Sequence, residues 1–256
     1  MAEADLLYKV ENRVAHLIIN REAQRNTINA DVVALFFQYL DEAEKDPGVR
    51  AVCITGAGER AFCAGADLGG SMTGDGRDGF QKYADLLKRL ARFPKPTVAR
   101  VNGYCLAGGT GFMLACDIVI AADNARFGTP EVNVGLFPMM IGALIFRNTL
   151  RKKAMEMVLL GEKLTAEQAL EMGMVTRVVP EDRLDGEVEQ VLQELSLKSP
   201  IGMKIGKEAF YEMADMPFEA AVDYLCGQLK AVVSTGDARE GIRAFVEKRS
   251  PHFTGK

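Results

Sequence analysis

Residues 97–121 read TVARVNGYCLAGGTGFMLACDIVIA, and this stretch decides the class of fold. Thr97–Val101 is mostly apolar and predicts a buried β-strand. Residues 102–111 are rich in glycine and predict a turn, which runs into an apolar helix at residues 112–115. A further apolar strand is expected at residues 118–121. Strand, turn, helix and strand in this order are typical of an α/β fold.

The alternation extends toward both ends of the chain. We expect strands at residues 6–10, 14–20 and 51–55, a helix opened by residues 29–31 and running to about Lys45, loops at residues 61–68 and 69–79, and a helix at residues 80–93. Beyond Pro180 the pattern becomes helical, with helices expected at residues 184–197, 202–213, 218–234 and 238–248. The chain therefore divides into an α/β core, residues 1–198, and a helical segment, residues 199–256.

Composition narrows the class of protein. Of the 256 residues, 48% are apolar and 26% are charged, as in ordinary globular proteins. The net charge of −4 argues against a nucleic-acid-binding protein, including an RNA-binding one. The sequence contains no apolar run near the roughly 18 residues that a membrane span needs, and its acidic start is unlike a signal peptide. We therefore expect a cytoplasmic protein that does not bind membranes.

The five cysteines predict neither a disulfide framework nor a metal site. Their number is odd, and none of them forms a C-x-x-C pair. Most stand among apolar or small residues, where cysteine behaves as a small hydrophobic side chain. We expect reduced thiols in the core, and no His, Cys or carboxylate cluster of the kind that binds a metal.

Two glycine-rich loops follow buried strands at similar points. One includes Cys63-Ala64-Gly65-Ala66-Asp67, and the other includes Leu106-Ala107-Gly108-Gly109. Small side chains let a ligand approach the backbone, so two N–H groups could converge there on one oxyanion. Ordinary strand-to-helix turns have the same composition, so both interpretations stay open on this pattern alone. A dinucleotide site is excluded, because Gly109-x-Gly111 lacks the third glycine of G-x-G-x-x-G.

Motifs spread over nearly the whole chain resemble the crotonase (enoyl-CoA hydratase/isomerase) superfamily. They are Ala61-Phe62-Cys63-Ala64-Gly65-Ala66-Asp67-Leu68, Asn102-Gly103-Tyr104 with Ala107-Gly108-Gly109, Cys116-Asp117-Ile118, Ala122-Asp123 with Phe127-Gly128-Thr129-Pro130-Glu131, Gly135-Leu136-Phe137-Pro138, Ala169 with Gly173-Met174-Val175, and Phe245-Val246-Glu247-Lys248-Arg249. They occur in the order found in that family.

The resemblance implies a fold, an assembly and a site. The fold is an α/β spiral of ββα units with a helical C-terminal segment that forms homotrimers, often paired into hexamers. An acyl-CoA thioester would rest its carbonyl oxygen on the N–H groups of Ala66 and Gly108, with Glu131 as the catalytic carboxylate. Residues matching substrate- or CoA-binding positions are Arg25, Asn26, Ala64, Asp67, Leu68, Gly109, Gly111, Pro138, Met139, Phe245 and Lys248, the last two reaching a neighbouring subunit's CoA. No cofactor is implied besides the CoA of the substrate, and fatty-acid metabolism is the implied setting.

One departure from the family pattern bears on the reaction. Hydratases of this family use two glutamates, and Gly111 stands where the first is expected. Glu131 then has to carry the proton transfers alone or with water, which favours double-bond isomerisation or hydration with a single carboxylate. If the apolar neighbours of Glu131 bury it, its pKa should be raised. The alternative is a CoA-thioester-binding protein of the same fold with little activity. Met139 and Met140 stand where many members of the family have glycines, which predicts either a narrower and more apolar acyl pocket or ordinary core side chains.

Overall fold

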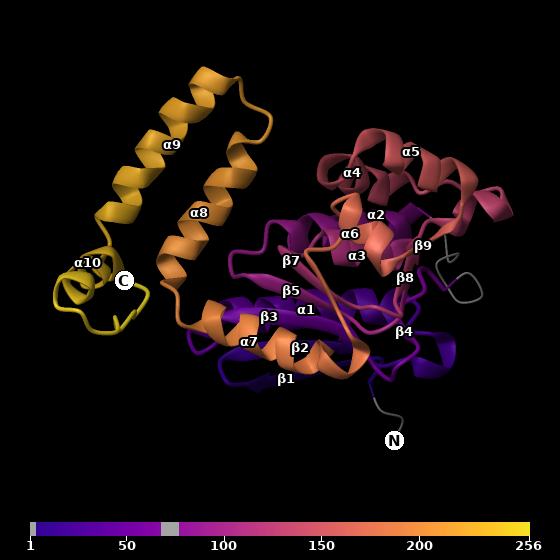
Figure 1. The fold of residues 1–256 in the computed structure, drawn as a ribbon, viewed down its shortest axis with the longest axis horizontal. Helices are drawn as coiled ribbons and strands as arrows, with labels where there is room; N and C mark the ends of the chain where they lie inside the picture. Colours follow the sequence, from indigo (N-terminus) through magenta and orange to yellow (C-terminus); the bar gives the residue numbers. More distant parts are fainter. Residues whose placement is uncertain (1–3, 68–76) are drawn as a thin grey trace.

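The computed structural model describes residues 4–67 and 77–256, and its larger sheet has six strands (Figure 1). In spatial order they are β1 (Leu6–Glu11), β2 (Val14–Ile19), β3 (Ala51–Gly56), β5 (Thr97–Val101), β7 (Ile118–Ala122) and β10 (Arg177–Val179). The first two form an antiparallel hairpin, and every other neighbouring pair is parallel. The central strands are buried on both faces, which explains their nearly continuous apolar sequences.

A second sheet of short strands lies beside the first. Its order is β4 (Ala61–Cys63), β6 (Tyr104–Leu106), β8 (Arg126–Gly128) and β9 (Lys163–Thr165). Along the chain, β3, β5 and β7 enter the larger sheet, and β4, β6 and β8 follow them into the smaller one. Each pair leads to a helix: α2 (Arg77–Ala91), α3 (Gly108–Leu114) and, after the 3-10 turn η2 (Pro130–Val134), α4 (Met139–Asn148). This repeat confirms the expected ββα spiral.

The remaining helices of the core close both faces of the larger sheet. Helix α1 (Ala30–Lys45) contacts β1 and β2, and the side chain of Asn29 caps it by accepting from the N–H of Val32. Helix α7 (Leu184–Ser196) contacts β3, β5 and β7 through a separate apolar cluster. The other elements are η1 (Glu22–Gln24), α5 (Arg151–Leu160), α6 (Ala166–Glu171) and η3 (Glu181–Arg183). Buried side chains therefore fix the sheets from which the site loops emerge.

The C-terminal helices form an arm that extends away from the two sheets. Figure 1 shows α8 (Pro200–Met213) and α9 (Phe218–Val233) side by side, with α10 (Gly236–Val246) at the far end from β4 and β8. The arm has several exposed apolar side chains, namely Phe210, Phe218, Val222, Leu229, Val233, Ile242, Phe245 and Val246. None of the helices in the described part of the chain is both long and apolar enough to cross a membrane.

The predicted long strands and helices are confirmed, but α4 and α5, of ten residues each, were not predicted, and several short elements were placed wrongly. The predicted loop at 61–68 begins with strand β4, because those three residues pair with β6. The predicted turn at 102–111 contains β6 and the first turn of α3. Helix α2 starts at Arg77, inside the loop predicted at 69–79. The boundary at residue 199 stays a prediction, although Ser199 caps α8.

Candidate functional site

The two glycine-rich loops meet at one edge of the smaller sheet. They follow β4 and β6, which are neighbouring parallel strands, so both loops leave the sheet in the same direction. A Cβ atom on Gly65 would lie 2.7 Å from the Cβ of Ala107, and one on Gly109 would overlap the carbonyl oxygen of Cys63. Gly65 also has a φ of +105°, which glycine adopts readily. Glycine at positions 65 and 109 therefore allows the close approach of the two backbones.

This approach brings the N–H groups of Ala66 and Gly108 together. Ala66 pairs with Ile28 through Gly65 and Asp67, since Ile28 N–H donates to Gly65 O at 2.8 Å and Asp67 N–H donates to Ile28 O at 2.9 Å. The N–H of Ala66 takes no part in that pairing, and its nitrogen lies 3.6 Å from the position that a Cβ on Gly108 would occupy. Neither N–H has a protein acceptor within residues 4–67 and 77–256. Two such neighbouring donors can bind a single anionic oxygen.

Glu131 has an acceptor oxygen that the protein does not use. It lies in η2, directly after Pro130, and is half-buried. Its Oε2 atom is buried and has no hydrogen-bond partner in the described structure. Burial raises the pKa of the Glu131 carboxyl, as expected from the sequence. A carboxyl group of this kind can accept a proton at neutral pH and hold it until it is returned.

Gly111 faces Tyr83, a residue that was not predicted from the sequence to belong to the site. A Cβ on Gly111 would lie 2.7 Å from the hydroxyl oxygen of Tyr83 and 2.5 Å from Cγ2 of Ile141. Tyr83 stands on α2, far from the glycine motifs in sequence, and its neighbours show only an ordinary amphipathic pattern. The missing family glutamate was the one available signal, because some other group has to fill the space beside a glycine.

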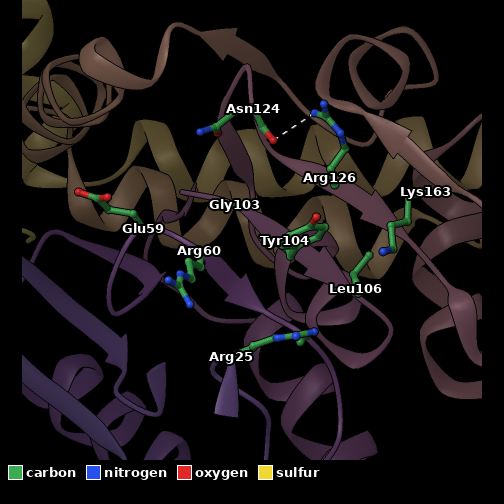
Figure 2. Close-up of a pocket in the computed structure, with 10 residues that line it drawn as sticks. Arg25, Glu59, Arg60, Gly103, Tyr104, Leu106, Asn124, Arg126 and Lys163 are labelled. Atoms are coloured by element: carbon green, nitrogen blue, oxygen red, sulfur yellow. Dashed lines mark hydrogen bonds between the residues drawn. The ribbon is translucent and has the colours of Figure 1, made fainter. Parts of the chain in front are cut away.

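A basic pocket of about 480 Å³ opens beside Ala64. Four basic side chains and one acidic side chain line it together with polar and apolar groups; the charged ones are Arg25, Arg60, Arg126, Lys163 and Glu59. Figure 2 shows them around Tyr104, and the Lys163 amine lies 5.2 Å from the centre of that ring. Only Arg25 and Ala64 were selected from the sequence, because the other cations come from short strands and turns outside the family motifs.

Asn26 and Asp67, both predicted from the sequence to bind substrate or CoA, hold the loops in place. The side chain of Asn26 is buried and donates to Ala57 O at 3.0 Å and Ala61 O at 2.7 Å, so it does not face a ligand. Asp67 accepts from Arg21 at 2.9 Å, and Arg21 also donates to Thr27 O at 2.7 Å. Both contacts fix the segment that contains Gly65 and Ala66.

The remaining residues predicted from the sequence to bind substrate or CoA do not all lie beside the glycine-rich loops. Pro138 is buried and stands immediately before α4, whereas Met139 is 74% exposed and belongs to no core cluster. Phe245 is 85% exposed in the last turn of α10, and Lys248 is exposed just beyond that helix, which lies away from β4 and β8 of its own chain (Figure 1). Leu68 lies outside the described residues. Among the residues that are described, no group of three or more His, Cys, Asp or Glu side chains could hold a metal ion.

Comparison with known proteins identifies the family of this chain. The sequence profile named enoyl-CoA hydratase/isomerase matches residues 9–256. The 2,3-dehydroadipyl-CoA hydratase of Escherichia coli is 33% identical, over 99% of this chain and all of that protein. The 1,2-epoxyphenylacetyl-CoA isomerase of Escherichia coli is 35% identical, over 98% of each. The crystal structure of an enoyl-CoA hydratase from Mycobacterium smegmatis superimposes with a TM-score of 0.93 at 32% identity, covering 98% of this chain and 99% of the other. The chain has the crotonase-like fold and belongs, as an enzyme, to the enoyl-CoA hydratase/isomerase family.

Proposed function

We propose that this enzyme converts an acyl-CoA thioester through an enolate, with Glu131 as its single proton-transfer group. The thioester oxygen would accept hydrogen bonds from the N–H groups of Ala66 and Gly108, which lack protein acceptors in the described structure. The observation that carries the proposal is the buried Oε2 of Glu131, which has no protein partner in the described structure, because proton exchange with a substrate would explain why this polar atom is left without one.

Double-bond isomerisation fits a site with one carboxylate. Glu131 removes a proton from C2 of a 3-enoyl-CoA, and the electron pair of that C–H bond moves onto the thioester oxygen as an enolate. The protonated Glu131 then returns the proton to C4, which gives the conjugated 2-enoyl-CoA. The reaction conserves every atom and needs one shuttle. The two amides stabilise the negative charge, and losing one such donor typically costs about 10²–10³ in rate.

Hydration of a 2-enoyl-CoA is the second candidate, because one of the relatives is named a hydratase. It passes through the same enolate but adds water to C3. Glu131 would have to deprotonate the water and then supply the proton for C2, since Gly111 offers no second carboxylate.

The basic pocket supports CoA as the carrier of the acyl group. Its charged lining of Arg25, Arg60, Arg126 and Lys163 with Glu59 suits the phosphates of CoA, and it opens beside Ala64, near the amides that would hold the thioester. We further propose assembly into a homotrimer or a pair of trimers through the C-terminal arm, because its helices expose apolar side chains. A cytoplasmic location and independence from metals and nicotinamide cofactors remain part of the proposal.

The direct test is a panel of CoA thioesters with mass analysis of the products. Crotonyl-CoA gains the mass of water on hydration, whereas a 3-enoyl-CoA keeps its mass and gains the absorbance of a conjugated thioester on isomerisation. Glu131→Gln should lower either rate by about 10²–10⁴. Binding of the thioesters without turnover would instead support the scaffold alternative. A chelator should leave activity unchanged.

A further inference from the structure

Tyr83 is bonded to the backbone of the proposed oxyanion site. It projects from α2, is only 4% exposed, and its ring meets the ring of Phe112 edge-on at 5.6 Å. Its hydroxyl donates to the carbonyl oxygen of Gly108 at 2.6 Å. The hydroxyl oxygen and Ala66 N both lie within 4 Å of the position that a Cβ on Gly108 would occupy. Tyr83 therefore stands beside the two amides.

The charge state of Tyr83 suits a hydrogen-bond donor. Burial raises the pKa of its hydroxyl well above the usual value, and the negative charge of Glu131 acts in the same direction. The hydroxyl consequently stays protonated at physiological pH.

The peptide before Gly108 has a strained backbone that needs support. Ala107 adopts φ +50° and ψ −124°, a conformation that costs a non-glycine residue about 1–3 kcal/mol. Its N–H donates to Gly128 O at 2.9 Å, and its carbonyl accepts from Thr110 N–H at 2.9 Å. The Tyr83 hydroxyl holds the next carbonyl along the chain, that of Gly108. The first two contacts fix the Ala107–Gly108 peptide, which carries the Gly108 N–H, and the Tyr83 hydroxyl fixes the carbonyl of the next peptide, so the backbone is held on both sides of the Gly108 Cα.

Tyr83 also fills the space beside Gly111. A side chain at position 111 would collide with the Tyr83 hydroxyl oxygen, 2.7 Å from its Cβ, and with Ile141. No carboxylate could stand at position 111 unless Tyr83 moved. The tyrosine and the glycine are therefore complementary in volume.

We infer that Tyr83 is a positioning residue, which holds the Gly108 carbonyl and thereby the backbone that presents the Gly108 N–H to an enolate, and which fills the space that a side chain at position 111 would need. This inference rests on the proposed enolate chemistry. It relates the tyrosine to the single acid of the site, because the space that a carboxylate side chain at position 111 would need holds a neutral hydroxyl bonded to the Gly108 carbonyl.

The test compares Tyr83→Phe with the wild-type enzyme, using Tyr8→Phe as a matched control. Tyr8 also stacks on an aromatic ring, that of Tyr39, but lies on β1 away from the loops. We expect Tyr83→Phe to lower kcat at least about tenfold, less than the ~10²–10³ for losing an oxyanion donor outright, with KM nearly unchanged. Tyr8→Phe should match the wild type.

A spectroscopic measurement separates positioning from folding. Acetoacetyl-CoA is a 3-oxoacyl thioester whose enolate absorbs in the near ultraviolet. The wild-type enzyme should lower the pH at which bound acetoacetyl-CoA enolises, and Tyr83→Phe should shift that pH back upward. Thermal unfolding of each variant shows whether it is folded under the assay conditions.

A double-mutant cycle provides a second route that does not depend on Tyr83→Phe alone. Gly111→Ala should displace the hydroxyl and lower kcat in the wild-type background, and should cost less in the Tyr83→Phe background. The collision with Ile141 is common to both backgrounds and cancels in the comparison.

The outcomes separate this inference from the proposed function. If the wild type neither turns over enoyl-CoA thioesters nor perturbs the enolate spectrum, the proposed function fails and the role of Tyr83 fails with it. If the wild type does both and Tyr83→Phe behaves identically, the proposed function stands, and Tyr83 merely fills space.

Discussion

At the scale of single residues, Glu131 is held in an environment that disfavours its charge. Burial raises its pKa, so the carboxylate needed to accept a proton forms only above the usual pH range of a glutamate. The acidic limb of the pH profile for kcat/KM should therefore lie above the range of an ordinary carboxyl group. A limb at the usual carboxyl value would contradict the role of Glu131. The measurement is the initial rate with a 3-enoyl-CoA at constant ionic strength.

The same environment predicts that replacing the Glu131 carboxylate does not lower the stability of the fold, although it lowers activity. Because the pKa of Glu131 is raised in the folded state, its contribution to stability is present at low pH and is lost as pH rises through the folded pKa. Glu131→Gln should therefore unfold at an equal or higher temperature than the wild type at pH 7, and the difference should shrink toward acidic pH. Thermal melts between pH 7 and acidic pH test this expectation. A Glu131→Gln variant that is less stable than the wild type at pH 7 would show that the protein stabilises the Glu131 carboxylate.

Ala107 gives a third residue-scale prediction, on backbone strain. Replacing it with glycine removes a cost of about 1–3 kcal/mol and adds about 0.5–1 kcal/mol of unfolded-state entropy, so the net change should stabilise by roughly 1 kcal/mol. Urea unfolding measures the difference. The control is Ala143→Gly, an exposed position within α4, where glycine should destabilise by about 1 kcal/mol.

At the scale of elements, most long segments could be predicted from the sequence, whereas α4, α5 and the short strands of the smaller sheet could not. Strands such as β3 and helices such as α9 have apolar patterns that determine their state locally. The three-residue strands β4, β6 and β8 have no such pattern, since their pairing depends on chain segments far apart in sequence. The site loops follow these short strands, so the resemblance identified the loops that periodicity alone would have left as turns.

The contact between the β4 and β6 loops predicts a sharp difference between two glycines. A Cβ on Gly109 would overlap a backbone oxygen of Cys63, which cannot move without disturbing β4. Gly109→Ala should therefore cost more than about 3 kcal/mol of unfolding free energy, or prevent folding. Gly142→Ala on α4 is the control, because its Cβ would meet nothing within 4 Å. Equal stability of the two variants would mean that the loops do not pack as described.

At the scale of the whole molecule, the C-terminal arm exposes apolar side chains that the packing of the core leaves uncovered. Val222, Leu229 and Val233 lie along one side of α9 at helical spacing and are all exposed. If the arm builds the proposed trimer, Leu229→Asp with Val233→Asp should shift the sedimenting species toward smaller assemblies. Lys230→Ala, an exposed polar change on the same helix, should leave the assembly unchanged. A wild-type chain that sediments as a monomer would refute the proposed assembly.

The sequence predicted residues of the site only where a family motif contains them. Ala66, Gly108 and Glu131 stand in family motifs, and the structure brings the first two together. Tyr83, Arg126 and Lys163 could not be found in this way, because they are not motif residues and only the folded chain places them at the site. The motifs therefore predicted the two backbone amides and the Glu131 side chain, but not most of the side chains that line the site.

The distribution of thiols in the fold has a practical consequence for handling the enzyme. Cys53, Cys63 and Cys105 are buried in the core, and burial raises the pKa of their thiols, whereas Cys226 is exposed on α9. Cys226 stands at helical spacing between Val222 and Leu229, on the side of α9 proposed for the trimer, so assembly should shield it. A fluorescent thiol reagent should therefore label Cys226 faster when Leu229→Asp and Val233→Asp open the assembly than in the wild-type background, and Cys226→Ser should abolish that labelling.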